Sequence, residues 1–260
     1  MKESVQIGEN ETFKYTFVRE GHGKSLKKIL VCEDEDAIRD FVVINLKRAD
    51  YEVVDVNSGE AAFIEFKKAL DDRPFDVALL DIMMPGMDGT ELCRKIRDES
   101  KSIGIIMLSA KSQEMDKITC LTIGADDYVT KPFSPSELVA RVDAIYRRVN
   151  LNVSGGAGGS ELVSGLFAVN TRSRVITKNG EQLDLTQVEY QIMEYFIKNV
   201  GVALDRKSIL IHIWGDKYYG DDKIVDVNIR RLRMKVEDDP SSPVYIQTVW
   251  GYGYKWAVDN

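Results

Sequence analysis

The sequence predicts an α/β domain, built on a five-stranded doubly wound parallel sheet, followed by a smaller α+β domain. Three observations lead to this fold class. Short apolar runs alternate with amphipathic stretches between residues 28 and 149. The run NLNVSGGAGGS at residues 150–160 has the glycine and serine content of a flexible linker. Beyond it, the pattern changes to short strands and three helical segments.

These changes in pattern divide the 260 residues into four segments. We expect residues 1–27 to be an N-terminal extension of unknown role and residues 28–149 to form the first domain. Residues 150–160 are the expected linker, and residues 161–260 form the second domain. Each domain is long enough to bury a core without disulfides or a structural metal.

Five buried strands are expected in the first domain, at residues 29–32, 51–56, 75–80, 104–108 and 128–130. Helices are expected between and after them, at residues 36–49, 58–70, 89–99, 113–123 and 134–149. Five consecutive β–α units favour a parallel sheet with helices on both faces, because the crossovers are right-handed. Ligand sites in such sheets lie beyond the carboxyl ends of the strands.

The second domain has a different order of elements. Strands are expected at residues 162–169, 174–178 and 182–185, and Asn179-Gly180 is a hairpin turn signal. Helices are expected at residues 186–199, 205–214 and 223–237, and a final hairpin pairs residues 245–249 with 254–258. Thr186 and Glu189 have the spacing of a capping box, which marks the start of the first of these helices.

Composition limits the classes of protein that fit. Three cysteines, widely spaced and without a CxxC pair, indicate free thiols in a reducing compartment. No apolar run approaches 18 residues, so we expect a cytoplasmic protein without membrane contact. The net charge of −7 argues against indiscriminate nucleic-acid binding, although it permits a local basic surface.

Polar residues with a common chemistry follow the expected strands of the first domain. Glu33 and Asp34 follow the first strand, Asp81 ends the third, Ser109 the fourth and Lys131 the fifth. We expect them to meet at one edge of the sheet, where clustered carboxylates require a hard cation such as Mg²⁺. A metal-neutralised carboxylate facing a lysine can accept a phosphoryl group. Each residue alone is more often structural, but the whole set indicates function.

One helix of the second domain is strongly basic. Residues 223–235 carry five cations and a single acid, Asp226. An apolar stripe would seat the helix on its own domain, and away from it lie groups able to bond base edges or phosphates. These expected DNA contacts are Lys223, Val227, Asn228, Arg230, Arg231, Arg233 and Lys235. A basic amphipathic helix alone is more often a solvated face.

Four segments of the first domain resemble the receiver signature of two-component response regulators. They are ILVCEDE at residues 29–35, LLDIMMPGMDG at 79–89, LSA at 108–110 and GADDYVTKPF at 124–133. The resemblance implies a flavodoxin-like receiver in which Asp81 takes a phosphoryl group from the phosphohistidine of a sensor histidine kinase.

The same resemblance implies roles for the neighbouring residues. Glu33, Asp34, Asp81 and the backbone carbonyl of Met83 would hold Mg²⁺. Ser109 and Lys131 would contact the phosphoryl oxygens, and Tyr128 would rotate inward on activation. The Lys131–Pro132 peptide bond would be cis, which an X-Pro bond permits.

Three segments of the second domain resemble the winged-helix effector of the OmpR/PhoB subfamily: IWG at residues 213–215, VDVNIRRLR at 225–233 and TVWGYGY at 248–254. The resemblance implies that the basic helix enters the major groove and that the final hairpin is the wing, with Thr248 and Trp250 as DNA contacts. Some relatives have arginine at the position of Trp250. This tryptophan therefore either contacts DNA or packs against its own domain.

The receiver resemblance also implies a symmetric receiver dimer. The implied charged pairs are Lys117–Glu137, Asp127–Arg141 and Asp126–Arg148. Exposed ion pairs contribute little each, so most of the stabilisation would come from apolar contacts between them.

Together these features predict a DNA-binding transcriptional response regulator. Phosphorylation of Asp81 would promote homodimerisation and binding to double-stranded promoter DNA, with RNA polymerase as a further partner. The protein would not be an enzyme acting on external substrates, because it accepts one phosphoryl group and hydrolyses it. The alternative is a phosphorylation-independent regulator or interaction module with a vestigial acidic pocket.

Overall fold

The computed structural model describes residues 26–110, 123–150, 161–216, 218 and 221–257. The expected N-terminal extension, the glycine-rich linker and nearly all of the helix expected at residues 113–123 lie outside the described residues. Among the described helices, none has the length and apolar character needed to cross a membrane.

The first domain is a parallel sheet, as predicted. Its strands are β1 (Lys28–Cys32), β2 (Glu52–Val56), β3 (Val77–Asp81), β4 (Gly104–Ser109) and β5 (Asp127–Thr130). They lie in the order β2-β1-β3-β4-β5, with every neighbouring pair parallel. The strand order reverses between β1 and β3, so their carboxyl ends border the crevice where such sheets bind ligands.

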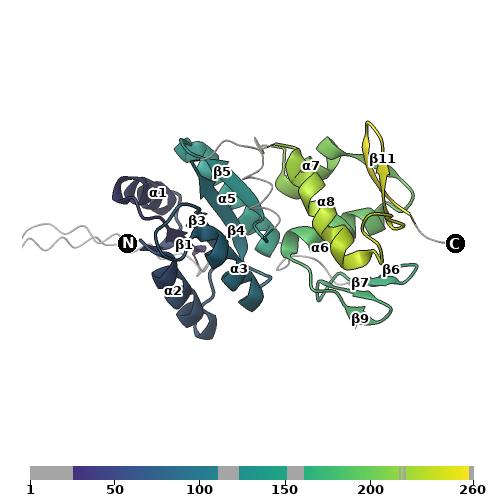
Figure 1. Ribbon diagram of the computed structural model, residues 1–260, viewed down its shortest axis with the longest axis horizontal. Coiled ribbons are helices and arrows are strands. Elements are labelled where there is room, and N and C mark those ends of the chain that lie inside the picture. The colour runs from purple at the N-terminus through teal and green to yellow at the C-terminus, as the bar shows by residue number, and fades with distance from the viewer. Residues whose placement is uncertain (1–25, 111–122, 151–160, 217, 219–220, 258–260) are drawn as a thin grey trace, which may run out of the picture.

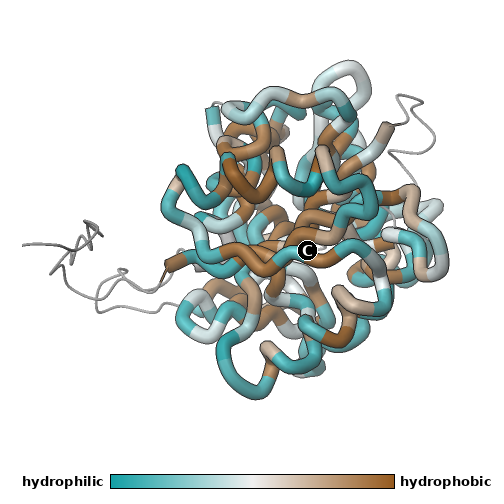
Figure 2. Tube along the Cα trace, turned by 90° about the vertical axis from the view of Figure 1, so that its left-hand side faces the viewer, coloured by the Kyte–Doolittle hydropathy of each residue, from teal (hydrophilic) through white to brown (hydrophobic). Residues whose placement is uncertain are grey.

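The four described helices of this domain are α1 (Asp36–Arg48), α2 (Gly59–Asp71), α3 (Gly89–Glu99) and α5 (Pro135–Asn150). Alternate residues of each strand point to opposite faces of the sheet. One set, which includes Ile29 and Val31, packs with α1 and α5, and the other, which includes Leu30 and Cys32, packs with α2 and α3. Figure 2 shows hydrophobic segments running through the middle of the molecule and hydrophilic ones on the outer loops.

The second domain begins with an antiparallel sheet of β6 (Glu161–Ser164), β7 (Phe167–Asn170), β8 (Val175–Lys178) and β9 (Glu181–Gln182). It continues with α6 (Gln187–Lys198), α7 (Arg206–Trp214) and α8 (Lys223–Val236). A second sheet has the order β10-β12-β11, made by β10 (Ala203–Asp205), β11 (Ile246–Val249) and β12 (Gly253–Trp256). The predicted capping box of Thr186 and Glu189 is confirmed.

Three details of the second domain differ from the prediction. The strand expected over residues 162–169 is two strands, because the chain turns at Gly165, whose φ of 57° suits glycine. The strand expected at 182–185 ends at Gln182. Strand β10 was not predicted, because three residues are too few to show an alternating pattern.

The two domains pack against each other through a defined pair of surfaces. Strand β5 and helix α5 lie on the side of the first domain that faces α6, α7 and α8 (Figure 1). Helix α5 contacts both α6 and α7.

Candidate functional site

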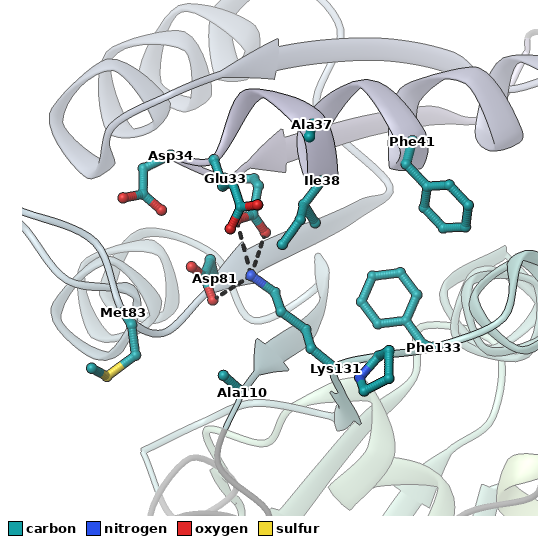
Figure 3. A pocket seen from close by; sticks show the side chains of 12 residues that line it. Glu33, Asp34, Ala37, Ile38, Phe41, Asp81, Met83, Ala110, Lys131 and Phe133 are labelled. Carbon is teal, nitrogen blue, oxygen red and sulfur yellow. Dashed lines mark hydrogen bonds and ion pairs between the residues drawn. The ribbon is translucent and has the colours of Figure 1, made fainter.

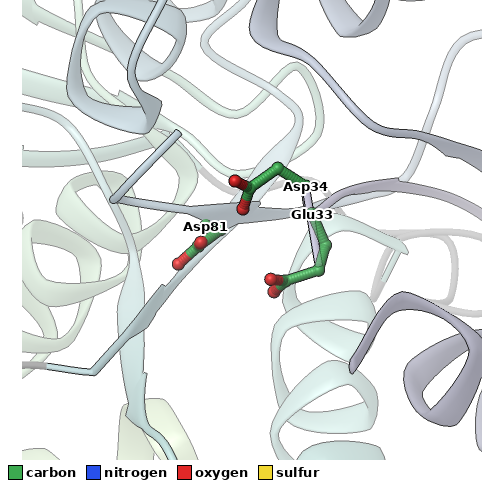
Figure 4. Close-up of side chains that lie close together, drawn as sticks. All are labelled: Glu33, Asp34 and Asp81. Carbon is green, nitrogen blue, oxygen red and sulfur yellow. The ribbon is translucent and has the colours of Figure 1, made fainter. Parts of the chain in front are cut away.

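Three carboxylates meet at the carboxyl edge of the parallel sheet. Glu33 and Asp34 directly follow β1, and Asp81 is the last residue of β3. Each offers an oxygen that lies within 4.8 Å of the oxygens offered by the other two (Figure 4). Glu33 and Asp81 are buried and Asp34 is exposed. The predicted convergence of these acids is therefore confirmed.

Lys131 brings a positive charge into this cluster from the end of β5. Its Nζ lies 2.7 Å from Oε2 of Glu33 and 3.1 Å from Oδ1 of Asp81 (Figure 3). The peptide bond between Lys131 and Pro132 is cis, as predicted. One ammonium group thus compensates two of the three carboxylates.

Burial controls the protonation of the cluster. Loss of solvent raises the pKa values of Glu33 and Asp81, and the Lys131 ammonium group opposes that rise at both. Burial, with Asp81 and Glu33 close by, also raises the pKa of the Cys32 thiol to about 12, so this cysteine under the site is unreactive.

The donor set fits a small divalent ion. All three side chains offer oxygen, the ligand that Mg²⁺ prefers. Asp34 faces solvent, so an ion bound here could keep several of its waters, as Mg²⁺ usually does. The clustered negative charge would also attract such an ion electrostatically.

A cavity of about 950 Å³ opens over the carboxylates. Its lining is acidic on one side and apolar on another, where Ile38, Phe41 and Phe133 lie (Figure 3). The rings of Phe41 and Phe133 are 6.2 Å apart. The cavity is large enough to admit a side chain of a partner protein beside the acids.

Ser109 lies in β4, beside the strand that carries Asp81, and Tyr128 lies in β5, which pairs with β4. Ser109 ends β4 and is buried, and Ala110, next to it, lines the cavity. Tyr128, in β5, pairs in register with Met107 and is also buried.

Helix α8 has the apolar stripe that was predicted. Val225, Ile229, Leu232 and Val236 are all buried and hold the helix against its own domain. Arg230 is exposed on the helix surface.

The surface of α8 away from this stripe is only partly exposed: Arg230 and Met234 face solvent, but three of the expected DNA contacts do not. Val227, Asn228 and Arg231 are buried. Arg231 donates from Nη1 to the carbonyl oxygen of Ala125 in the first domain, at 3.2 Å, and pairs with Glu189 at 2.9 Å. The expectation that all of these residues face solvent was wrong, and at Arg231 the reason is the contact with the first domain.

Two other cations of α8 have partners within the second domain. Arg233 donates from Nη2 to the carbonyl oxygen of Ile246 at 2.6 Å and to Oγ1 of Thr248 at 2.9 Å, which fixes the wing against the helix. Lys235 donates to the buried Glu189 carboxylate at 2.7 Å. These cations therefore have structural roles in addition to any contact with DNA.

Trp250 is 91% exposed at the tip of the wing. The alternative that it packs against its own domain is therefore wrong. Gly251, with a φ of 71°, turns the chain between β11 and β12 and thereby projects this side chain outward. Tyr252 is also exposed at the wing tip, and sequence reasoning did not single it out.

The residues expected to pair between two receivers behave differently from one another. Arg141 pairs within the chain with Asp127 at 3.1 Å and with Glu137 at 2.9 Å. The Asp126 carboxylate is buried and bonded to the side chain of Arg97 and the backbone nitrogen of Ile105. It is therefore enclosed, contrary to the expectation of an exposed partner.

Two of the expected dimer positions, Lys117 and the side chain of Arg148, lie outside the described residues. Sequence reasoning missed two residues that bind these acids: Arg97, which pairs with Asp126, and Tyr218, whose hydroxyl donates to Asp127 at 2.7 Å. In the sequence Arg97 looks like an ordinary arginine on a helix surface, and Tyr218 belongs to no motif.

Comparison with known proteins identifies the family of each domain. Residues 29–143 match the family "Response regulator receiver domain" and residues 180–256 match "Transcriptional regulatory protein, C terminal". The chain is 39% identical over 230 residues to the sensory transduction protein RegX3 of Mycolicibacterium smegmatis, covering 88% of this chain and 99% of that one. It is 40% identical over 235 residues to RegX3 of Mycobacterium tuberculosis, with the same coverage.

Two solved structures of RitR mutants resemble the whole two-domain chain. Their TM-scores are 0.69 and 0.68, at 26% and 25% sequence identity, and each match covers 88% of this chain and 98% of theirs. The chain therefore belongs to the two-component response regulators that join a receiver domain to a DNA-binding transcriptional regulatory domain of the OmpR/PhoB type.

Proposed function

We propose that Asp81 is the phosphoacceptor, and that its phosphorylation by a sensor histidine kinase controls promoter binding by the second domain. The observation that carries this proposal is the position of Asp81. Its carboxylate lies at the end of a buried strand, 3.1 Å from the Lys131 ammonium group and within the cluster formed with Glu33 and Asp34. In the proposed transfer, a carboxylate oxygen of Asp81 attacks the phosphorus, the N–P bond of the phosphohistidine breaks, and the electron pair of that bond returns to the imidazole.

The surrounding side chains would each have a different role in this transfer. Lys131 would place its positive charge beside the phosphoryl oxygens, and Ser109 would donate a hydrogen bond to one of them. Glu33, Asp34, Asp81 and the backbone carbonyl of Met83 would hold Mg²⁺. The ion would supply positive charge that offsets the repulsion between the carboxylate and the incoming phosphoryl group.

The receiver would act once per phosphorylation and would not turn over an external substrate. Water would later hydrolyse the acyl phosphate at Asp81, which ends the signal. Inward rotation of Tyr128 would accompany the active state, and it would follow the movement of Ser109 towards the phosphoryl group.

We infer that the second domain binds DNA through α8 and the wing. Lys223 would bind phosphates, and Thr248 and Trp250 would bring the wing to the neighbouring groove. The other proposed contacts lie on α8: Val227, Asn228, Arg230, Arg231, Arg233 and Lys235. The observation that supports a DNA contact by Trp250 is its exposure of 91% at the wing tip.

Receiver pairing would bring two effector domains to adjacent half-sites and so increase avidity. We propose that Asp127, Glu137 and Arg141 form the described part of that dimer surface, with Lys117 and Arg148. Asp126 is not included, because its carboxylate is bonded inside the receiver to Arg97 and to the backbone nitrogen of Ile105. The bound dimer would act on RNA polymerase in the cytoplasm, where promoter DNA lies.

The proposed domain boundaries follow the changes in sequence pattern. They are a receiver at 28–149, a linker at 150–160 and an effector at 161–260, after an extension at 1–27.

Phosphorylation with a small phosphodonor tests the central proposal. The full-length protein is incubated with acetyl phosphate and Mg²⁺, and peptide mass spectrometry locates any added phosphoryl group. We expect one phosphoryl group on Asp81. Asp81→Asn should abolish it, and Asp34→Asn should raise the Mg²⁺ concentration needed for half-maximal phosphorylation. Asp71→Asn, which changes an exposed carboxylate at the end of α2, should have no effect.

A second experiment distinguishes a regulator controlled by phosphorylation of Asp81 from a module that acts without phosphorylation. DNA fragments are selected with phosphorylated protein and with an Asp81→Ala variant. An unmodified Asp81, together with identical DNA recovery by both proteins, would favour the phosphorylation-independent module with a vestigial pocket.

A further inference from the structure

The β3–α3 loop, residues 82–88, joins Asp81 to α3 beside the acidic site. At its base, the backbone nitrogen of Gly89 donates to the carbonyl oxygen of Ile82 at 3.2 Å. Gly89 also lies so close to the carbonyl oxygen of Asp81 that a Cβ would not fit there. The Asp88 side chain caps the start of α3. Both ends of the loop are therefore fixed to the sheet and the helix.

The middle of this loop carries the backbone groups that face the site. The backbone nitrogen of Met83 donates a hydrogen bond to the Asp81 carboxylate. Met83 also lines the cavity over the acids (Figure 3). The next residue, Met84, is buried, and its sulfur lies 3.4 Å from the Cys32 thiol. A shift of this part of the loop would move both the donor to Asp81 and the Met83 carbonyl, the proposed Mg²⁺ ligand.

An acid from another helix supports the far side of the loop. Glu60, in the first turn of α2, accepts through Oε1 from the backbone nitrogen of Met87 at 2.8 Å. The loop is equally close at Gly86, where an added Cβ would lie 2.7 Å from the same oxygen. Hydrogen bonds from its own backbone nitrogen and from that of Met87 hold the pKa of Glu60 below its usual value. The acceptor is therefore charged at neutral pH, which strengthens the bond.

Helix α2 gives Glu60 a firm base. Ala62 and Phe66 are buried in the core on this face of the sheet. Gly59 lies directly against the carbonyl oxygen of Met87, and a Cβ at this position would not fit. Met87 is thus held at both of its backbone groups, the N–H by Glu60 and the carbonyl by the start of α2.

We propose that Glu60 is a positioning residue for the acidic site: by holding Met87 it places the Met83 carbonyl and thereby sets the affinity for Mg²⁺. The inference rests on the proposed function, because that function assigns Mg²⁺ to this site. Glu60 is not among the three acids whose oxygens meet at the sheet edge. A group that orients a ligand changes metal affinity without touching the ion. The competing explanation is that the Glu60 charge attracts the ion directly through space.

Two substitutions of Glu60 separate the hydrogen bond from the charge. Glu60→Gln loses the charge but keeps an oxygen that can accept from Met87, whereas Glu60→Ala loses both. Glu65→Ala is the matched control, because Glu65 is an acid of the same helix whose ion-pair partner is Lys68, at 2.7 Å, on that helix.

The main measurement is a Mg²⁺ titration of the unphosphorylated full-length protein, followed by NMR with isotope-labelled methionine. Three of its 8 methionines, Met83, Met84 and Met87, lie in the loop, so their amide signals report the loop position and the bound ion. This readout needs no phosphoryl transfer. A parallel series measures the Mg²⁺ concentration that gives half-maximal phosphorylation by acetyl phosphate.

We expect Glu60→Ala to raise the Kd for Mg²⁺ about tenfold and to move the amide signal of Met87. Glu60→Gln and Glu65→Ala should match the wild type in Kd, and circular dichroism confirms that each variant is folded. Equal weakening by Gln and Ala at position 60 would overturn the positioning role, because the charge would then act by itself. An unchanged Kd in Glu60→Ala would overturn it as well.

The two readouts distinguish failure of this inference from failure of the proposed function. A Kd that depends on Glu60 as expected, in a protein that acetyl phosphate leaves unmodified, would uphold the positioning role and count against Asp81 as phosphoacceptor. A wild-type protein that binds no Mg²⁺ would overturn the inference together with the proposed metal site.

Discussion

The buried pair of Arg97 and Asp126 should be essential to the stability of the receiver. Arg97 is 4% exposed and donates to the carbonyl oxygens of Gly124, at 2.7 Å, and Ile103, as well as to the Asp126 carboxylate. In Arg97→Met, that carboxylate, itself only 2% exposed, would keep the backbone nitrogen of Ile105 as its hydrogen-bond donor among the described residues. The substitution therefore leaves a buried charge without its counter-ion.

The cost follows from these contacts. Breaking a buried ion pair by removing one partner costs about 3–5 kcal/mol. Each of the two orphaned carbonyls adds about 1 kcal/mol. We expect Arg97→Met to lower the free energy of unfolding by about 5–7 kcal/mol, which is comparable with the whole stability of a marginal domain. Asp126→Asn in the same chain should recover part of this loss, because the stranded group is then neutral.

Urea unfolding of the full-length protein can separate the two domains. All three tryptophans, Trp214, Trp250 and Trp256, lie in the effector domain. Tryptophan fluorescence therefore follows the effector, and the part of the circular dichroism transition that fluorescence does not follow reports the receiver. Arg94→Met, at an exposed position on the same helix, is the control and should change the free energy of unfolding little. A loss below about 1 kcal/mol for Arg97→Met would refute the reasoning, because buried charges cannot be left unpaired so cheaply.

Two further predictions concern the effector domain. Burial alone would raise the pKa of Glu189, but the charges of Arg231 and Lys235 outweigh it and hold that pKa below its usual value. Because the folded pKa is lower than the unfolded one, the stabilisation is present above the unfolded pKa, near 4, and is lost as the pH falls through the folded pKa. Glu189→Gln should therefore lower the Tm at pH 7 but not at strongly acidic pH, as followed by tryptophan fluorescence, and an equal difference at both pH values would contradict the assignment. Trp250→Ala should weaken binding to a selected DNA fragment about tenfold, as exposed tryptophans at interfaces often do. It should leave the Tm unchanged because the side chain is 91% exposed, and equal DNA affinity in an anisotropy titration would exclude Trp250 from the contact.

The parallel sheet and the acidic site could be predicted from local sequence patterns. A strand buried on both faces is a short apolar run, and the polar residue at its carboxyl end is visible in the sequence. Because all the strands are parallel, those ends must share one edge, so Glu33, Asp34, Asp81 and Lys131 could be placed together without coordinates. The capping box at Thr186 was equally visible, since a cap depends on residues only three positions apart.

Which surfaces are exposed depends on how the elements and the two domains pack together. The sequence shows which face of α8 is apolar, but it does not show that Asn228 and Arg231, which lie away from the stripe, are buried, or that Arg231 contacts the receiver. The position of Tyr218 on Asp127 and the enclosure of Asp126 by Arg97 likewise join residues from separate elements. Such contacts depend on how complete helices and strands pack against one another. They cannot be read from the sequence, because helical or strand periodicity indicates only which face of an element is buried in its own core.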